Sequence, residues 1–184
     1  RDELGCDYYG TSLHKWLLAP IGTGFLYVRR DRIPGIWPLM AAPQAMDADI
    51  TKFEEIGTHP QANFNAIAVA LSFHRGIGAE RKAARMRWLR DRWARPLMAV
   101  SDRVRILTPL DDPRQACGIG FVSVSGLDAA KLYSWLRSRW QIVTTPIVHD
   151  EFTGLRITPN VYTMAREADL FVEAVTAAIR KGIA

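Results

Sequence analysis

The sequence predicts an α/β protein in two parts, and three observations lead to this class. Short apolar and aromatic runs alternate with longer segments whose apolar residues recur at helical spacing. Two glycines, Gly76 and Gly78, interrupt the chain just before a long basic segment. A hydrophobic content of 48% and a charged content of 23% are ordinary for a globular protein. We therefore predict a first part over residues 1–76 and a second over residues 77–184.

Size and composition limit the functions open to this chain. Its 184 residues are enough for one domain with a hydrophobic core, or for parts of two. Cys6 and Cys117 form no disulfide framework or metal-binding pattern, which favours a cytoplasmic setting. No apolar run is long enough to span a bilayer, so no membrane partner is expected. The net charge of +5 fits an anionic partner or solubility alone.

The first part begins with two predicted strands, residues 5–9 and residues 25–28. The tight turn Gly22-Thr23-Gly24 directly precedes the second strand. A dinucleotide-binding loop is a poor alternative, because the third glycine of that motif is replaced by Tyr27 and no helical pattern follows.

Residues 29–49 are predicted to form an irregular segment. An ordinary packed loop is the expectation here, although Trp37 and Met40 could instead cover an active-site mouth, a domain seam or a partner subunit. Three prolines exclude a regular helix from this segment: Pro34, Pro38 and Pro43.

A helix is predicted after Gly57-Thr58. Thr58 and Gln61 have the spacing of a capping box, and Pro60 suits a first helical turn. Thr58 could be a plain N-cap, or its hydroxyl and the helix N-terminus could bind a phosphate, and the two roles are compatible. The apolar face of this helix consists of Phe64, Ile67, Ala68 and Leu71.

A strongly basic helix is predicted over residues 80–95, ended or kinked by Pro96. Its apolar stripe comprises Met86, Leu89 and Trp93. Such a helix could bind nucleic acid, but a linking helix with a solvated cationic face is preferred because no nucleic-acid motif accompanies it. Its basic residues are Arg81, Lys82, Arg85, Arg87, Arg90, Arg92 and Arg95.

The rest of the chain predicts a small α/β domain with a mixed sheet and helices on one face. Asp128 is the predicted N-cap of a helix over residues 129–139, and Thr163 that of the last helix. Strands are predicted over residues 104–107, 118–124, 141–144 and 155–158.

Lys15 is the residue on which the functional prediction centres. It lies between the first two predicted strands, in Ser12-Leu13-His14-Lys15-Trp16, and we expect it to be half-buried. Burial penalises the charged ammonium, so the neutral amine becomes accessible and can attack an aldehyde. From local context alone, a surface lysine at a strand end is the more ordinary interpretation.

One run of residues resembles the cofactor-lysine segment of class V aminotransferases, which are fold-type I enzymes dependent on pyridoxal 5'-phosphate (PLP). It extends from Asp7 to Val28, and members similar to isopenicillin N epimerase look closest. The resemblance covers nearly the whole chain but only about the second half of the family's length. It implies the remainder of the large PLP-binding domain over residues 1–76, then a linking helix and a small C-terminal α/β domain. The chain also opens without a methionine, so we expect a fragment that is inactive alone.

The resemblance implies roles for the residues around Lys15. Lys15 would form a Schiff base with PLP and, once the substrate amine has displaced it, move a proton at the substrate α-carbon. Ser12 and His14 match family residues that contact the PLP phosphate or its ester oxygen; without the resemblance they could be a turn hydroxyl and a core histidine. Gly57 and Thr58 match a motif that reaches the PLP phosphate of the neighbouring subunit, which implies a homodimer with a shared active site.

Arg156 is the second predicted anchor. It lies in an otherwise apolar strand, where an arginine needs a partner. That partner could be a protein carboxylate in a structural salt bridge. It could instead be the carboxylate of a ligand, which matches the two parallel N–H donors of the guanidinium. The resemblance implies the latter, because a family arginine in this segment binds the α-carboxylate of the amino-acid substrate.

Other functions remain as alternatives. A cysteine desulfurase or selenocysteine lyase is less favoured, because residues 149–153 before Arg156 contain no cysteine. Another alternative is a non-catalytic basic module that binds an anionic polymer. A further one is a decayed homologue that is kept for dimerisation. The four histidines lack metal-ligand spacing, so no metal is expected. The partners of the PLP ring belong to the missing half, and no residue here decides between transamination and epimerisation.

Overall fold

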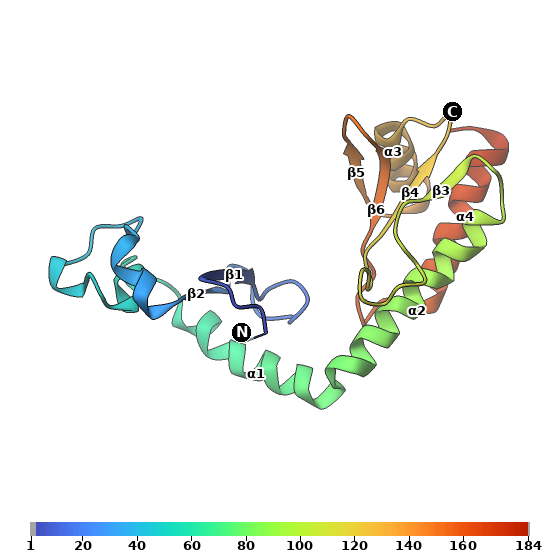
Figure 1. Ribbon diagram of the computed structural model, residues 1–184. Coiled ribbons are helices and arrows are strands. Elements are labelled where there is room, and N and C mark those ends of the chain that lie inside the picture. Colours follow the sequence, from blue (N-terminus) through green and yellow to red (C-terminus); the bar gives the residue numbers. More distant parts are fainter. Residues whose placement is uncertain (1–2, 184) are drawn as a thin grey trace. The chain divides into compact units, whose positions relative to one another are not determined.

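The computed structural model describes residues 3–183, and the chain divides into two compact units, Arg1–Ile77 and Gly78–Ala184 (Figure 1). In the first unit the elements are β1 (Tyr8–Ser12), β2 (Gly24–Val28), η1 (Arg30–Gly35), η2 (Gln44–Met46), η3 (Ile50–Glu54) and α1 (Gln61–Ile77), where η marks a 3-10 helix. In the second unit they are α2 (Ala79–Met98), β3 (Val104–Ile106), β4 (Gly120–Val124), α3 (Ala129–Trp140), β5 (Thr145–Val148), β6 (Thr153–Ile157) and α4 (Ala165–Lys181).

β1 and β2 form an antiparallel ladder that ends where Ser12 pairs with Gly24. The strand predicted over residues 5–9 is wrong in its position. β1 runs past Gly10, because Gly10 pairs with Leu26 and the ladder continues to its last residue. This shift places Ser12 at the end of the strand, directly before the lysine loop, which we define as residues 13–23.

Residues 29–49 contain no α-helix, as the prolines predict. The segment folds around Lys52, whose side chain is only 3% exposed. The Lys52 ammonium donates to the backbone oxygens of Ile33 and Asp47 at 2.8 and 2.7 Å, and it lies 3.2 Å from the Asp47 carboxylate. One buried ammonium therefore connects η1, η3 and the end of η2.

Several large apolar side chains of this segment are exposed, although Ile33 is only 6% exposed. Trp37 is 93% exposed and Leu39 is 100% exposed, and Met40 is also exposed. The prediction of an ordinary packed loop is therefore confirmed only around Ile33 and not for residues 37–40. The polar contacts of Lys52 and the burial of Ile33 hold the segment together.

α1 begins at Gln61, so Thr58 is not its N-cap and the predicted capping box is wrong. Pro60, rather than Thr58, directly precedes the first helical residue. The predicted apolar face of α1 also stays largely open, because Phe64 and Leu71 are both exposed.

The sheet of the second unit has the order β3-β4-β6-β5, and every neighbouring pair is antiparallel. The predicted mixed sheet is therefore wrong. The helices α2, α3 and α4 pack against this sheet (Figure 1). The core of the unit joins Val122 and Leu155 of the sheet to helix residues. These include Trp93 of α2, Leu136 of α3 and Phe171 of α4.

Two of the predicted helix starts have different outcomes. Asp128 caps α3 as predicted, since its carboxylate accepts the backbone N–H of Lys131 at 2.8 Å. Thr163 does not cap α4, because its hydroxyl accepts the backbone N–H of Asn160 instead. The N-cap of α4 is Met164, whose N–H donates to the Glu167 carboxylate at 2.6 Å.

Residues 141–144 are not a strand. Gln141 has φ +57°, in the left-handed region, and this residue turns the chain off the end of α3. β5 therefore begins only at Thr145, and residues 141–144 form an irregular connection to it.

α2 has the predicted apolar stripe, since Met86, Leu89 and Trp93 are all buried. It does not end at Pro96 but continues to Met98. Pro96 lies in the last turn, where the missing N–H costs only one intrahelical bond. No described helix of the chain has the length and the apolar character needed to cross a membrane.

The cationic face of α2 is less solvated than predicted. Arg90 is 1% exposed, and its guanidinium donates to the backbone oxygens of Cys117 and Leu110 at 3.0 and 2.8 Å. It also pairs with the Asp91 carboxylate at 2.7 Å. Arg90 therefore fastens the segment before β4 to α2, because only a long side chain with several donors can satisfy these oxygens inside the protein.

Arg90→Met is expected to lower the free energy of unfolding by about 3 kcal/mol, because it leaves two backbone oxygens and a carboxylate without their donor. Urea denaturation of the purified protein measures the change. Arg81→Met, at an exposed position of the same helix, is the matched control and should stay within about 0.5 kcal/mol of the unsubstituted protein. Equal stability of the two variants would show that Arg90 has no structural role.

Candidate functional site

The lysine loop connects β1 to β2 and is held by its own backbone. The N–H of Leu13 donates to the Thr23 oxygen at 3.0 Å, and the N–H of Ala19 donates to the Leu13 oxygen at 3.1 Å. Thr23 is 2% exposed, and its hydroxyl donates to the Pro20 oxygen at 2.7 Å. Gly22, with φ +87°, makes the turn that brings Thr23 back to β2. These contacts give a long loop a single conformation.

His14 is half-buried within this loop. Its Nδ1 lies 3.2 Å from the Thr23 oxygen, a contact that requires the proton on Nδ1. The Nε2 atom is then an acceptor in the neutral ring and a donor in the charged ring. Thr23 thus fixes both the loop and the orientation of the imidazole.

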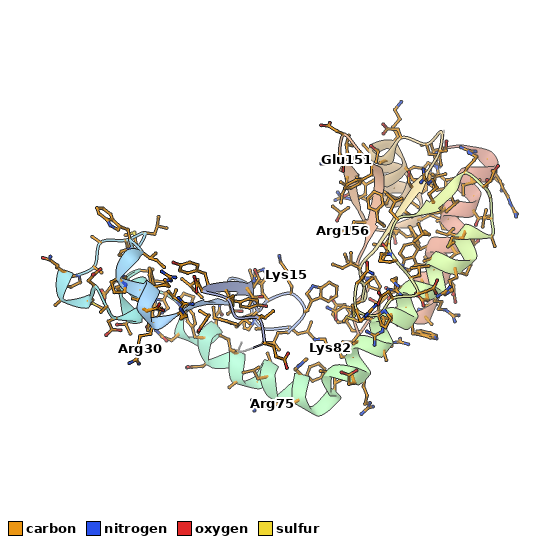
Figure 2. The ribbon with its side chains drawn as sticks, in the orientation of Figure 1. Lys15, Arg30, Arg75, Lys82, Glu151 and Arg156 are labelled. Carbon is orange, nitrogen blue, oxygen red and sulfur yellow. The ribbon has the colours of Figure 1, made fainter. Side chains whose placement is uncertain are left out.

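Lys15 is exposed at the outer side of the loop, and Figure 2 shows it on the connection after β1. Its ammonium has no hydrogen-bond or ion-pair partner among residues 3–183. The prediction that Lys15 is half-buried is wrong for this unit, because the loop protrudes from a ladder of only two described strands. Ser12 is exposed next to it, at the end of β1.

Gly57 and Thr58 lie in the same unit as the lysine loop. Gly57 has φ +77°, and its oxygen lies 2.9 Å from Nδ1 of His59. The Thr58 side chain is exposed and has no partner in the described part of the chain. In the first turn of α1, Asn63 donates its side-chain N–H to the Ile21 oxygen of the lysine loop at 3.3 Å. The N-terminus of α1 is therefore attached to that loop.

A cavity of about 600 Å³ opens beside this segment. Its walls come from the start of β2, from η3 and from His59, Gln61 and Phe64 around the start of α1. The first amide groups of a helix have no intrahelical partner, so they remain available to an anion.

Arg156 lies on β6 in the second unit, on the sheet face opposite the core (Figure 2). It pairs in register with Phe121 on one side and Thr145 on the other. Within residues 3–183 its guanidinium makes one weak hydrogen bond, with Nη2 lying 3.5 Å from the Thr145 hydroxyl. No carboxylate of the described residues lies within ion-pair distance, so the structural salt bridge considered from the sequence is absent there. The fork of donors is available to a ligand.

Aromatic side chains that the sequence argument overlooked lie near Arg156. The Phe121 ring contacts Phe152 edge to face, with centroids 5.3 Å apart. The His149 ring stacks on Phe152, with centroids 4.8 Å apart. His149 and Phe152 belong to the turn between β5 and β6, and only the strand register reveals that Phe121 lies across from Arg156.

The remaining cations of α2 are mostly paired within the protein. Arg92 binds Asp169 at 2.7 Å, and Arg95 binds Asp111 at 2.6 Å. Arg85 stacks on Trp88 and donates to a backbone oxygen. This leaves few free charges for an anionic polymer, which disfavours the basic-module alternative.

Cysteine and metal chemistry find little support in the described residues. Both cysteines are free thiols, and the Cys117 thiol contacts the Ala83 oxygen on α2 rather than lying on the turn before Arg156. Residues 3–183 contain no group of three or more His, Cys, Asp or Glu side chains that could hold a metal ion.

The lysine loop of this α/β chain carries an exposed amine and an imidazole next to it, with an exposed hydroxyl at the end of β1, and proteins use such groups to hold aldehyde and phosphate ligands. Residues 1–145 match the family described as Aminotransferase class-V, and the chain belongs to this family. It is 31% identical over 192 aligned residues to an isopenicillin N epimerase of Streptomyces clavuligerus, covering 95% of this chain and 48% of that protein. It is 30% identical over 190 residues to a probable hercynylcysteine sulfoxide lyase of Mycobacterium tuberculosis, covering 95% of this chain and 45% of that protein.

Solved structures support the fold. A cysteine desulfurase of Thermococcus onnurineus NA1 aligns with a TM-score of 0.76 at 19% identity, over 97% of this chain and 48% of that one. A cysteine desulfurase of Escherichia coli aligns with a TM-score of 0.76 at 20% identity, over 97% of this chain and 47% of that one. The predicted fold class, part of a fold-type I PLP-dependent enzyme, is confirmed. The chain spans about half the length of the curated relatives it matches.

Thr23→Val is expected to loosen the lysine loop, because it removes the buried hydroxyl contact to Pro20. A loss of about 1 kcal/mol of local stability predicts roughly fivefold faster amide exchange at Leu13 and Ala19. Hydrogen exchange followed by NMR measures this change. Thr11→Val in the neighbouring strand is the control and should leave both rates unchanged; slow exchange in both variants would show that the hydroxyl does not hold the loop.

Proposed function

We propose that this chain carries the cofactor lysine and the carboxylate-binding arginine of a PLP-dependent enzyme that acts on an amino acid, by amino transfer or epimerisation. The observation that supports it most is the state of Lys15: an exposed amine without a partner among residues 3–183, on a loop that the hydrogen bonds of Thr23 connect to β2. Family membership supplies the class of cofactor. The activity of the whole protein belongs to the proposal, because the chain spans about half of its relatives.

The residues of the first unit fit PLP by the chemistry of their donors. Lys15 would hold the aldehyde carbon covalently, and Ser12 and His14 would bind the phosphate or its ester oxygen. The exposed hydroxyl of Thr58 and the amide of Gly57 would reach the phosphate bound in a second subunit, so we infer a homodimer. When bound, PLP accepts into its ring the electron pair left on the α-carbon after proton removal.

Lys15 would also move the proton. When its Nζ is not bonded to the cofactor, Lys15 would accept the α-proton of the substrate, provided that the assembled site excludes water and keeps the amine neutral. Protonation of the same carbon on its opposite face, by a donor other than Lys15, would give epimerisation, and no described residue decides between this outcome and amino transfer.

Arg156 would bind the substrate carboxylate. Its guanidinium presents two parallel N–H donors, and no described carboxylate competes for them. Two-point binding fixes the orientation of the amino acid, which positions the α-proton for the base. The two unpaired thiols, Cys6 and Cys117, fit a cytoplasmic location for this enzyme.

A carbon–sulfur lyase is the second candidate. The relative from Mycobacterium tuberculosis, whose name describes a sulfoxide lyase, matches this chain almost as well as the epimerase does. A desulfurase that needs a cysteine on the turn before Arg156 is less favoured, because residues 149–152 contain none.

Lys15→Ala is expected to abolish the visible absorption of lysine-bound PLP in the full-length protein. Borohydride reduction of the unsubstituted protein should leave PLP on the peptide that contains Lys15, as mass spectrometry would detect. Lys131→Ala, at an exposed position of the second unit, is the control and should retain the absorption. PLP found on another lysine, or never taken up, would contradict the proposal.

Arg156→Lys is expected to weaken binding of amino acids by about 100-fold, because a lysine cannot bind a carboxylate at two points. The change of PLP absorption on titration with a panel of L-amino acids gives the half-saturating concentration. The substitution should hardly change the affinity for the carboxamide of the best-binding amino acid, because the amide lacks the negative charge of the carboxylate. Arg105→Lys, on an exposed position of β3, is the matched control. If the amino acid and its carboxamide lost affinity equally, Arg156 would not be the residue that binds the carboxylate.

A further inference from the structure

We propose that the open face of the sheet around Arg156 binds the side chain of the substrate amino acid, and that this side chain is large and apolar, with an aromatic ring as the best fit. The inference rests on the proposed function, because it takes Arg156 as the residue that binds the substrate carboxylate. It adds the class of side chain that the enzyme accepts. The residues that carry it lie on β4, β5, β6 and the turn between β5 and β6.

Phe121 and Arg156 lie on the same face of the sheet. They are direct partners in the antiparallel register of β4 and β6, and the Cβ atoms of such partners lie about 5 Å apart. Their sequence neighbours Val122 and Leu155 belong to the core, so Phe121 and Arg156 extend from the opposite face. An aromatic side chain therefore lies directly beside a guanidinium that no described carboxylate neutralises.

Gly154 determines where the Phe121 ring lies. This glycine is buried two residues before Arg156, on the same face of β6. A Cβ atom at Gly154 would lie 2.8 and 2.9 Å from two carbons of the Phe121 ring, which is closer than such atoms approach. The ring thus covers the bare backbone of Gly154, and it meets the Phe152 ring edge to face. The two rings form one apolar surface next to Arg156.

Phe152 is held in place by its turn, yet it remains accessible. The His149 N–H donates to the Phe152 oxygen at 3.0 Å, and the Glu151 N–H donates to Nδ1 of His149 at 3.2 Å. The His149 ring stacks on the Phe152 ring with the two planes 22° apart. Phe152 is nevertheless 37% exposed. A positioned ring that water still reaches gains free energy when another apolar group covers it.

One small molecule can contact both the rings and the guanidinium. The Arg156 side chain reaches the Thr145 hydroxyl on β5, whereas Phe121 belongs to β4. Thr145 and Phe121 flank β6 on its two sides, so two strand spacings, or roughly 9.5 Å, separate them. A carboxylate joined to a phenyl ring by a short chain can lie across this width. The charge of Arg156 therefore selects an acid, and the rings select an apolar group at its other end.

The full-length protein loaded with PLP tests this inference with two acids, 3-phenylpropionate and propionate. Neither acid has an amine, so neither condenses with the cofactor, and the phenyl ring is the difference between them. Saturation-transfer NMR at increasing concentrations measures both affinities. We expect 3-phenylpropionate to bind about tenfold more tightly than propionate. Phe152→Ala should remove most of this advantage and leave the affinity for propionate unchanged. Val148→Ala, exposed on the other face of the same hairpin, is the matched control and should change neither affinity.

Phe121→Leu is a second variant, because it keeps an apolar residue in β4 while it removes the ring, and it should weaken only 3-phenylpropionate. The inference is overturned if 3-phenylpropionate binds no more tightly than propionate, or if both ring variants bind it as well as the unsubstituted protein does. Arg156→Lys should weaken both acids, and in that case these results would leave the carboxylate role of Arg156 intact. If Arg156→Lys changes neither affinity, or if neither acid binds, the carboxylate role fails and this inference fails with it.

Discussion

The backbone oxygen of Thr23 receives two N–H groups, one from the Leu13 amide and one from the His14 ring. This shared acceptor sets the conformation of the whole lysine loop, and the buried hydroxyl of the same residue secures the turn. In the role that we propose for Lys15, the amine would benefit from such support, because loose positioning costs rate steeply. The rigidity belongs to the backbone, so it does not depend on burying Lys15 itself.

In the second unit, the sheet fixes the backbone that carries Arg156. Its core lies on one side of an antiparallel sheet, so the strands present alternate side chains to the other side. Arg156 belongs to that open side, and its neighbours in register are an aromatic ring and a hydroxyl rather than a carboxylate. Burial of Leu155, the preceding residue, fixes the backbone from which Arg156 extends.

The sequence predicts some features that depend on local chemistry, although the N-caps predicted at Thr58 and Thr163 are wrong. Asp128 caps α3 and the prolines keep residues 29–49 out of an α-helix, because each acts within a few residues of its own position. Features that depend on distant partners were missed. Arg90 belongs to a basic run by pattern, yet it is buried against oxygens about twenty residues or more away. The antiparallel sheet and the aromatic neighbours of Arg156 depend on strand register, which no local pattern encodes. The family motifs located Lys15, but its exposure follows from the packing around its loop.

The burial of Lys52 has a chemical consequence for the first unit. Its ammonium is enclosed by oxygens from two separate segments, whereas the Lys15 amine is exposed. Reagents that acylate amines in water should therefore discriminate between these two lysines while the protein remains folded. Acylation of Lys52 would first require the segment from η1 to η3 to open, so the slow appearance of that adduct would report how often this segment unfolds.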